Sequence, residues 1–238
     1  SAYSYIASGL ADMVLVSGAE RYDSPGQILE WDNSRGEYKH PIFWASIFAK
    51  SYKREYGISD EQLAVVSVKN HKQAKENPNA LSNKTHSIED VLNSKKLTDD
   101  LRLLDCSRPC TGSASIILGS EEKVKQLSEN PVWITGIGQK TISAGFTKNI
   151  SFSSMESTKL AGQSALKMAD KNIENIDVAE IHDAFSVCEP MALESLGFSK
   201  NGKGMNTIKE LHDTDNFKIN PRGGLICNGH PLGATGIA

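Results

Sequence analysis

The sequence predicts an α/β protein, in which short buried strands alternate with amphipathic helices. Short apolar runs suited to strands occur at Met13–Ser17 and Ser113–Leu118, and segments with helical spacing follow each of them. A further strand and helix lead to a glycine-rich stretch, Asn220–Gly236. Alternation of strands and helices along a chain favours layers of helices packed on sheets.

The first part of the chain, residues 1–22, predicts the end of a helix followed by a strand. Tyr5 and Ile6 lie on one helical face, and Gly9 is a helix stop. Met13–Ser17 is a short apolar run, which is typical of a strand buried on both faces.

Residues 23–100 lack the strand patterns of the preceding segment, and we interpret them as a mostly helical insertion. Asp23–Gly26 breaks the preceding strand, and a polar, turn-rich segment continues to Pro41. Three helices are predicted from their end signals: Phe43–Tyr56 before Gly57, a helix begun by the capping box of Ser59 and Gln62, and a short helix capped by Ser87.

Strands and helices are expected to alternate again from residue 101. The core resumes at Leu101–Asp105, and a helix with acidic residues in its first turn begins at Glu121 after the strand Ser113–Leu118. Asn130 precedes a proline and is a predicted domain boundary, since a new strand, Val132–Gly136, follows at once. Residues 157–170 are predicted to form the next helix.

Composition and charge narrow the class of function. Hydrophobic residues make up 39% of the 238 residues and charged residues 23%, which is ordinary for a globular protein. A net charge of -3 gives no electrostatic reason to expect nucleic acid as a partner. No apolar run approaches the roughly 18 residues of a membrane span, no secretory signal opens the chain, and four cysteines are too few for a disulfide scaffold. We therefore expect a cytoplasmic protein.

A histidine, His182, lies where a predicted strand gives way to a helix. Val178 and Ile181 fit a short buried strand, and Phe185–Leu196 fits a helix. His182 and Asp183 therefore occupy a strand end, a common place for ligand contacts in α/β sheets. The alternative for this histidine alone is a buried, hydrogen-bonded structural role.

A second histidine, His230, lies in the glycine-rich stretch between Gly229 and Pro231. Glycine allows positive φ angles and close approach of a ligand to the backbone, and proline restricts the residue before it to extended geometry. Such a turn would hold one imidazole against a wall of backbone. An incidental histidine on a surface loop is the alternative.

Together these stretches resemble the thiolase superfamily. The resemblance is carried by Asn220-x-x-Gly223-Gly224, by Gly229-His230-Pro231-x-Gly233-Ala234-Thr235-Gly236, by the HDAF sequence His182–Phe185, and by the opening Ala7–Tyr22. The HDAF sequence is similar to that of sterol-carrier-protein-type and archaeal thiolases. The resemblance covers essentially the whole chain.

The resemblance implies a layered αβαβα thiolase fold with an inserted, mostly helical loop domain. Residues 1–22 and 101–130 would then belong to the N-terminal core, 23–100 to the loop domain, and 131–238 to the C-terminal core. It also implies that both catalytic cysteines of the family lie outside this sequence, so we expect a fragment that lacks both ends and is inactive alone.

The resemblance further assigns His182 and His230 as catalytic residues. His230 would pair with the nucleophilic cysteine and donate to the thioester oxygen of acetyl-CoA, and His182 would donate to that oxygen where other thiolases use asparagine. Asp183 is expected to contact backbone and hold its turn. The supporting loop residues are Asn220, Gly224, Gly229 and Gly233.

The cysteines inside the sequence are given other roles. Cys188 and Cys227 could be mistaken for the nucleophile, but buried free thiols are the preferred interpretation. Cys106 and Cys110 lack the tight spacing of a zinc knuckle, and although Cys227 and His230 could in principle complete a set, we predict no metal site.

One segment is rich in lysine, and its lysines are candidates for binding a negatively charged substrate. Six lysines lie between residues 69 and 96, at positions 69, 72, 75, 84, 95 and 96. A solvated helical face is one interpretation, and contact with the phosphates of coenzyme A is the other. The sequence does not choose among them, and no cofactor is expected beyond coenzyme A thioesters as substrates.

The resulting hypothesis is a thiolase-type acyltransferase, which condenses two acetyl-CoA to acetoacetyl-CoA or cleaves a 3-ketoacyl-CoA. The resemblance favours the biosynthetic direction that feeds the mevalonate pathway, a homodimer or homotetramer, and a complex with HMG-CoA synthase and a small zinc/OB-fold protein. The alternatives are a thiolase-like ketoacyl synthase and a non-catalytic or retro-aldolase relative that binds acyl-CoA and acts with a partner.

Overall fold

The computed structural model describes residues 1–22, 40–143, 151–214 and 218–238. The chain forms two compact units, each built from segments far apart in the sequence. The first consists of Ser1–Pro25, Pro109–Ile134 and His230–Ala238, and the second of Gly26–Arg108 and Thr135–Gly229. The predicted break of the strand at Asp23–Gly26 lies outside the described residues. The predicted domain boundaries stay a prediction.

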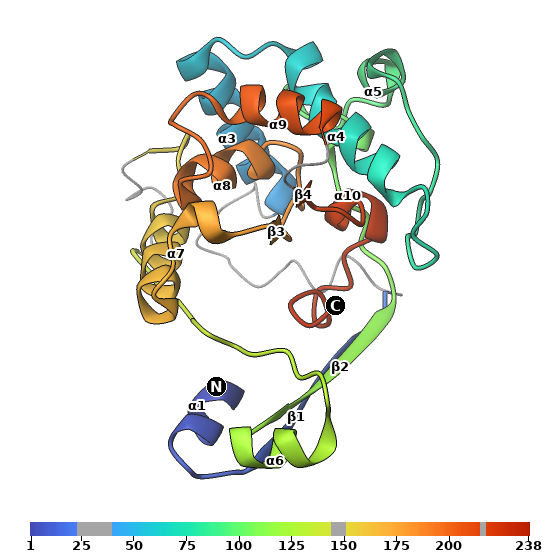
Figure 1. The fold of residues 1–238 in the computed structure, drawn as a ribbon. Coiled ribbons are helices and arrows are strands. Elements are labelled where there is room, and N and C mark those ends of the chain that lie inside the picture. The colour runs from blue at the N-terminus through green and yellow to red at the C-terminus, as the bar shows by residue number, and fades with distance from the viewer. Residues whose placement is uncertain (23–39, 144–150, 215–217) are drawn as a thin grey trace. The chain divides into compact units, whose positions relative to one another are not determined.

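The first unit is organised around an antiparallel pair of strands. β1 (Met13–Glu20) pairs with β2 (Gly112–Gly119) along its whole length, with Met13 opposite Gly119. α1 (Ala2–Ala7) precedes β1 and α6 (Glu121–Leu127) follows β2, so both helices lie at the same end of the pair (Figure 1). These elements confirm the predicted helix end, both strands and the helix after Ser113–Leu118.

The prediction that β1 is buried on both faces is wrong. Residues along β1 alternate between exposed and partly buried, and Met13 and Leu15 are 45% and 67% exposed. The alternation shows that the side chains on one face of β1 are exposed, whereas those on the other face are partly buried. The apolar run therefore correctly indicated a strand but not its surroundings.

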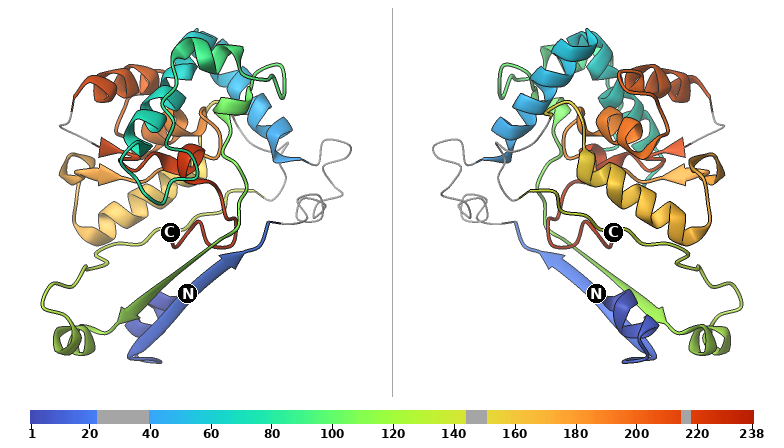
Figure 2. Two further views of the ribbon diagram at one scale, coloured as in Figure 1. Left: turned by 90° about the vertical axis from the view of Figure 1, so that its right-hand side faces the viewer. Right: turned by 90° about the vertical axis from the view of Figure 1, so that its left-hand side faces the viewer.

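The second unit is mainly helical. Its elements in chain order are α3 (Pro41–Tyr56), α4 (Asp60–Ala74), α5 (Ile88–Asn93), η2 (Leu103–Asp105), α7 (Glu156–Ala169), η4 (Ile173–Asn175), β3 (Val178–Ala179), α8 (Cys188–Leu196), α9 (Gly204–Asp213), β4 (Lys218–Ile219) and α10 (Gly224–Asn228). Figure 2 shows α3, α4, α8 and α9 packed together as one group of helices. The helix α9 was not predicted from the sequence.

The helix ends follow the local signals in the sequence. Gly57 ends α3 with a φ of +68°, a left-handed conformation that glycine adopts without strain. Ser59 and Gln62 form the predicted capping box of α4, and Ser87 caps α5. The three helices predicted between residues 43 and 93 are confirmed.

The core of the second unit joins these helices to a short parallel ladder, in which Val178 of β3 pairs with Lys218 of β4. Fully buried side chains come from α3, α4, α8, α9, β4 and the segment before η2: Ala49, Tyr52, Val66, Leu101, Met191, Leu193, Ile208 and Ile219. The Tyr52 hydroxyl also donates to Glu194 Oε1 at 2.5 Å, tying α3 to α8. This core fixes the ends of β3 and β4, where the candidate site lies.

The predicted strand Val132–Gly136 is wrong, because this segment has no strand partner among the described residues. Val132 is 96% exposed. Farther along, Gly136 and Gly138 lie against α7, where added Cβ atoms would stand 2.2 Å from Ala165 O and 1.9 Å from Ala161 O. Extended chain here packs on a helix rather than joining a sheet.

In the part of the chain that the structure describes, no helix is both long enough and apolar enough to cross a membrane.

The close approach of residue 138 to α7 predicts a strong effect of a single methyl group. Gly138→Ala places Cβ against the rigid backbone oxygen of Ala161, so we expect it to lower the free energy of unfolding by about 1–3 kcal/mol. Gly162→Ala is the matched control, because its Cβ meets only the flexible end of Leu196 and alanine favours a helix interior. Thermal unfolding of both variants checks the prediction, which fails if Gly162→Ala is the more damaging change.

Candidate active site

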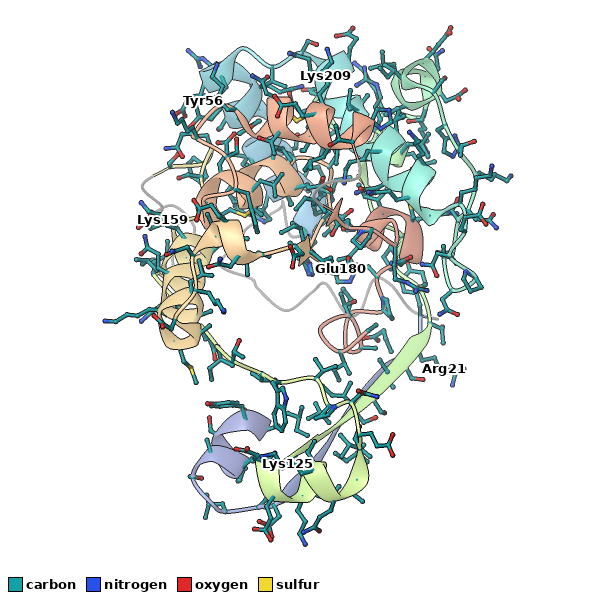
Figure 3. The ribbon with its side chains drawn as sticks, viewed as in Figure 1. Arg21, Tyr56, Lys125, Lys159, Glu180 and Lys209 are labelled. Atoms are coloured by element: carbon teal, nitrogen blue, oxygen red, sulfur yellow. The ribbon has the colours of Figure 1, made fainter. Side chains whose placement is uncertain are left out.

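The HDAF sequence forms a tight turn between β3 and α8. The Asp183 N–H donates to Ile181 O at 2.9 Å, so the backbone reverses around His182. Glu180, labelled in Figure 3, lies between the end of β3 and this turn, and burial raises the pKa of Glu180. The prediction that His182 and Asp183 follow a strand and precede a helix is confirmed, although α8 begins at Cys188 rather than at Phe185. The prediction that this strand is buried and includes Ile181 is wrong, because β3 ends at Ala179 and Val178 is 53% exposed.

Asp183 is fully buried and anchors this turn on one side. Its Oδ1 accepts the Leu225 N–H at 2.6 Å, and its Oδ2 accepts the Asn70 side-chain N–H at 2.7 Å. A Cβ at position 224 would lie 2.2 Å from Oδ2, so Gly224 makes room for the carboxylate. Burial, followed by the charge of Glu189, raises the pKa of Asp183 to about 7. The expected contact of Asp183 with backbone is therefore present.

Asn220 anchors the turn on its other side. It is completely buried and has a φ of +50°, a left-handed conformation that asparagine tolerates better than most residues. Its Oδ1 accepts the Ile181 N–H at 2.6 Å, and its Nδ2 donates to Glu189 Oε2 at 3.0 Å. Asn220 and Gly224, predicted as supporting residues of the glycine-rich loop, thus both contact the turn that carries His182.

A buried ion pair completes this arrangement and was missed in the sequence. Lys69 Nζ lies 2.8 Å from Glu189 Oε1 and donates to Ile219 O at 3.0 Å. Asn70 Nδ2 donates to Glu189 Oε2 at 2.9 Å as well as to Asp183. One signal could have found Asn70: it falls on the buried face of α4 with Leu63, Val66 and Ala74, where an unpaired amide would be costly.

The pairing of Lys69 also answers part of the question about the lysines. Its side chain is 2% exposed and held by Glu189, so Lys69 is not available to coenzyme A phosphates. The choice among the other lysines stays open in the described structure.

The His182 side chain itself is exposed at the turn, with anchored residues on both sides. The protein atoms around it still desolvate the charged imidazolium, so burial lowers the pKa of His182. The ring is therefore mainly neutral at pH 7, a state in which one nitrogen donates a hydrogen bond and the other accepts one.

His230 belongs to the first unit, where its loop packs on the two strands. It forms a parallel bridge with Pro109, and its Nδ1 lies 2.7 Å from Thr235 Oγ1. The Pro231 carbonyl accepts the N–H groups of Ala234 at 2.7 Å and Thr235 at 2.9 Å, which closes a compact turn after the histidine. The Thr235 contact orients the imidazole, with Nδ1 on the side of the hydroxyl.

Glycines allow this loop to approach the strands closely. A Cβ at Gly18 of β1 would lie 2.2 Å from Gly233 O, and one at Gly233 would lie 2.7 Å from Ala19 O. The Gly233 N–H also donates to Glu20 Oε2 at 3.1 Å. Gly229, which has a φ of +85°, precedes the histidine. Gly233 thus supports the backbone that carries His230, whereas Gly229 supplies the turn before it.

All four cysteines are free thiols. Burial raises the pKa values of Cys106, Cys188 and Cys227 to about 12, so these thiols stay protonated and are poor nucleophiles at neutral pH. The pKa of Cys110 is also raised by burial, although its sulfur accepts the backbone N–H of His230. Across residues 1–22, 40–143, 151–214 and 218–238, no group of three or more histidine, cysteine, aspartate or glutamate side chains could hold a metal ion.

A separate cavity of about 430 Å³ lies in the second unit at the start of α7. Its wall includes Phe48, Lys140, Ile142, Met155 and Ser157. His182 is not part of this wall, and Met155 is tied to the C-terminal half of α8 through Ser195, whereas His182 precedes the start of that helix. The cavity is therefore distinct from the HDAF turn.

Comparison with known proteins shows a similarity to thiolases. Residues 138–238 match the family model described as thiolase C-terminal domain-like. An acetyl-CoA acetyltransferase of Methanothermobacter thermautotrophicus is 34% identical over 242 residues, which cover 98% of this chain and 63% of the relative. The chain is therefore similar to thiolases over nearly its whole length. Sterol carrier protein 2 of Gallus gallus is 33% identical to this chain, and the matched residues cover 98% of this chain and 47% of the sterol carrier protein.

Solved structures agree on the α/β thiolase-like fold. An Ltp2-ChsH2(DUF35) aldolase superposes with a TM-score of 0.85 at 25% identity, covering 98% of this chain and 65% of that one. A monomeric SCP2-thiolase-like protein type 1 from Mycobacterium smegmatis superposes with a TM-score of 0.75 at 17% identity, covering 97% of this chain and 48% of that one. At this identity the likeness concerns only the fold. The chain spans between 47% and 63% of the length of the two curated relatives named above.

The buried carboxyl of Asp183 predicts an unusual dependence of stability on pH. Because its folded-state pKa of about 7 lies above the ordinary 3.8, the folded state binds the extra proton, and the contribution of Asp183 to stability falls as pH rises from about 4 to 7. Asp183→Asn removes this contribution. The destabilisation it causes relative to the parent should therefore be largest near pH 4 and shrink towards pH 8 in thermal unfolding.

Asp90→Asn is the control for this experiment. The pKa of Asp90 is lowered by its hydrogen bonds with Ser87 in the α5 capping box, so its contribution is complete above pH 4. The cost of Asp90→Asn should be constant between pH 5 and 8. A cost of Asp183→Asn that is equally flat would contradict the raised pKa.

Proposed function

We propose that this chain supplies the two catalytic histidines of a thiolase-type acyltransferase that uses coenzyme A thioesters. The observation that carries the proposal is the anchored HDAF turn, which presents His182 with both neighbouring residues held by buried hydrogen bonds. The similarity to archaeal acetyl-CoA acetyltransferases over 98% of the chain supports the same function.

The proposed reaction has two steps with a covalent intermediate. A cysteine, contributed by the full-length protein outside residues 1–238, attacks the thioester carbon of one acetyl-CoA, and the coenzyme A thiolate leaves with the proton from the cysteine. A second acetyl-CoA then gives an α-proton to a base, the second catalytic cysteine that the resemblance places outside this sequence, and its enolate carbon attacks the acetyl-enzyme. The new carbon–carbon bond forms as the carbon–sulfur bond to cysteine breaks, giving acetoacetyl-CoA. The proton is finally taken up by the cysteine thiolate that leaves.

The two histidines have separate tasks in this scheme. His230, oriented through Nδ1 by Thr235, pairs with the cysteine and carries its proton. His182 donates a hydrogen bond to the thioester oxygen of the second acetyl-CoA, where negative charge develops in the enolate. A lowered pKa suits His182 for this task, because a neutral imidazole keeps an N–H donor and does not protonate the enolate.

A retro-aldolase is the second candidate, favoured by the TM-score of 0.85 with an aldolase solved together with a DUF35 protein. Such an enzyme would cleave a 3-hydroxyacyl-CoA into a carbonyl compound and the enolate of a shorter acyl-CoA, which then takes up a proton. The same hydrogen bond from His182 would stabilise the enolate. No acyl-enzyme forms on this route, and a DUF35-type partner would be expected.

The reaction direction, cellular location and partners that we propose are those expected of the acyltransferase. We propose the biosynthetic direction, which supplies acetoacetyl-CoA to the mevalonate pathway in the cytoplasm, and a homo-oligomer that associates with HMG-CoA synthase and a small zinc/OB-fold protein. Residues 1–238 by themselves are expected to show no thiolysis.

Mass spectrometry of the full-length protein incubated with acetyl-CoA tests the proposal. An acyltransferase should gain about 42 Da on a cysteine, the mass of one acetyl group held as an acyl-enzyme. His230→Ala should slow this acetylation because it removes the proton acceptor. His182→Ala should leave acetylation intact and slow condensation, by about a hundredfold if it removes one donor to the enolate oxygen.

The two candidates differ in this experiment. Absence of the acetyl adduct, together with cleavage of a 3-hydroxyacyl-CoA that depends on His182, would reject the acyltransferase and support the retro-aldolase. Acetylation that His230→Ala does not change would remove His230 from its proposed task.

A further inference from the structure

Asn70 connects the two carboxylates that surround the HDAF turn. It lies on α4, is completely buried, and donates its two amide hydrogens to Asp183 Oδ2 at 2.7 Å and to Glu189 Oε2 at 2.9 Å. The partners are 113 and 119 residues away in the sequence. Asn70 is therefore a long-range link between a helix and both sides of the turn.

The geometry transmits this link to His182 through short steps, the first of which, from Asn70 to Asp183, is buried. Asp183 directly follows His182, and its two oxygens are held by Asn70 and by the Leu225 N–H. The Asp183 backbone N–H in turn donates to Ile181 O, which closes the turn around the histidine. A shift of the Asp183 carboxylate therefore moves the backbone from which the His182 side chain projects.

Electrostatics explain why an amide occupies position 70. Glu189 and Asp183 are both buried, and the charge of Glu189 is one cause of the raised Asp183 pKa. Lys69 neutralises the charge of Glu189, because its Nζ lies 2.8 Å from Oε1, the oxygen that Asn70 does not contact. Without the amide, Asp183 Oδ2 would lose the Asn70 donor and Glu189 Oε2 would keep the Asn220 donor, and a buried acceptor that loses its donor costs about 1–3 kcal/mol.

We propose that Asn70 is a positioning residue for His182, which holds the histidine in the orientation needed to donate to the thioester oxygen. This inference rests on the proposed function of His182. Asn70 does not touch substrate in this scheme and acts through Asp183. A misplacement of a catalytic group by about 1 Å costs on the order of a hundredfold in rate, so loss of this link should be visible in kcat.

The test combines Asn70→Leu with His182→Ala in the full-length protein. Leucine keeps the shape of asparagine and removes both donors. If Asn70 acts through His182, Asn70→Leu should lower kcat by about tenfold or more in the parent but by less than about twofold in the His182→Ala background, because the two losses are not independent. Asn70→Ser, which keeps one donor, should recover part of the rate.

Tyr52→Phe is the matched control. It also removes a buried hydrogen bond to a carboxylate on α8, at Glu194. Neither Tyr52 nor Glu194 belongs to the hydrogen-bond network described above around the HDAF turn. The substitution should lower the melting temperature as Asn70→Leu does and leave kcat near that of the parent. A similar loss of kcat in Tyr52→Phe would show that loosening α8 is sufficient, and would overturn the proposal.

Histidine NMR gives a readout that does not depend on activity. In protein labelled at the histidine ring carbons, the signal absent from His182→Ala reports His182, and Asn70→Leu should move the pKa of His182 towards the ordinary 6.5 as the turn loosens.

An unchanged His182 signal, or an equal loss of kcat with and without His182, would overturn the inference. A shifted signal with no effect of His182→Ala on the reaction would instead retain the positioning role and reject the proposed function.

Discussion

The burial of Asp183 and Glu189 beside one lysine is the constraint on which the second unit depends. Two carboxylates and one ammonium group cannot leave water without donors for every oxygen, and the free energy of a buried ion pair is seldom favourable by itself. Lys69, Asn70, Asn220 and the Leu225 N–H supply these donors. The network therefore specifies one arrangement of α4, α8, β4 and α10 rather than merely adding stability.

The same network shows which parts of the site the sequence could predict. The HDAF turn was predicted because its signals are local: a short apolar run, a histidine–aspartate pair and a helix within a few residues. The capping box at Ser59 and the helix cap at Ser87 are local in the same way and were predicted correctly. The pairing of Asn70 with Asp183 is not, because it joins residues 113 positions apart and no periodicity encodes it.

The errors have a common physical origin. An apolar run indicates a strand, but the burial of β1 and the partner that Val132–Gly136 would need depend on what other chain segments lie beside them. The lysines between residues 69 and 96 were treated as equivalent, whereas Lys69 is held inside the protein by Glu189. Tertiary contacts, which single-sequence patterns do not contain, decide each of these cases.

The interlocking of Asn70, Asp183, Glu189 and Asn220 has an evolutionary consequence. Replacing any one of them removes at least one buried hydrogen bond of another, so a single substitution passes through a less stable intermediate. Changes at these four positions should accumulate together in related sequences, as coordinated replacements. A lineage that abandons the carboxylate at 183 would then also be free to change residue 70, and the HDAF sequence would diverge as part of a set that spans most of the chain.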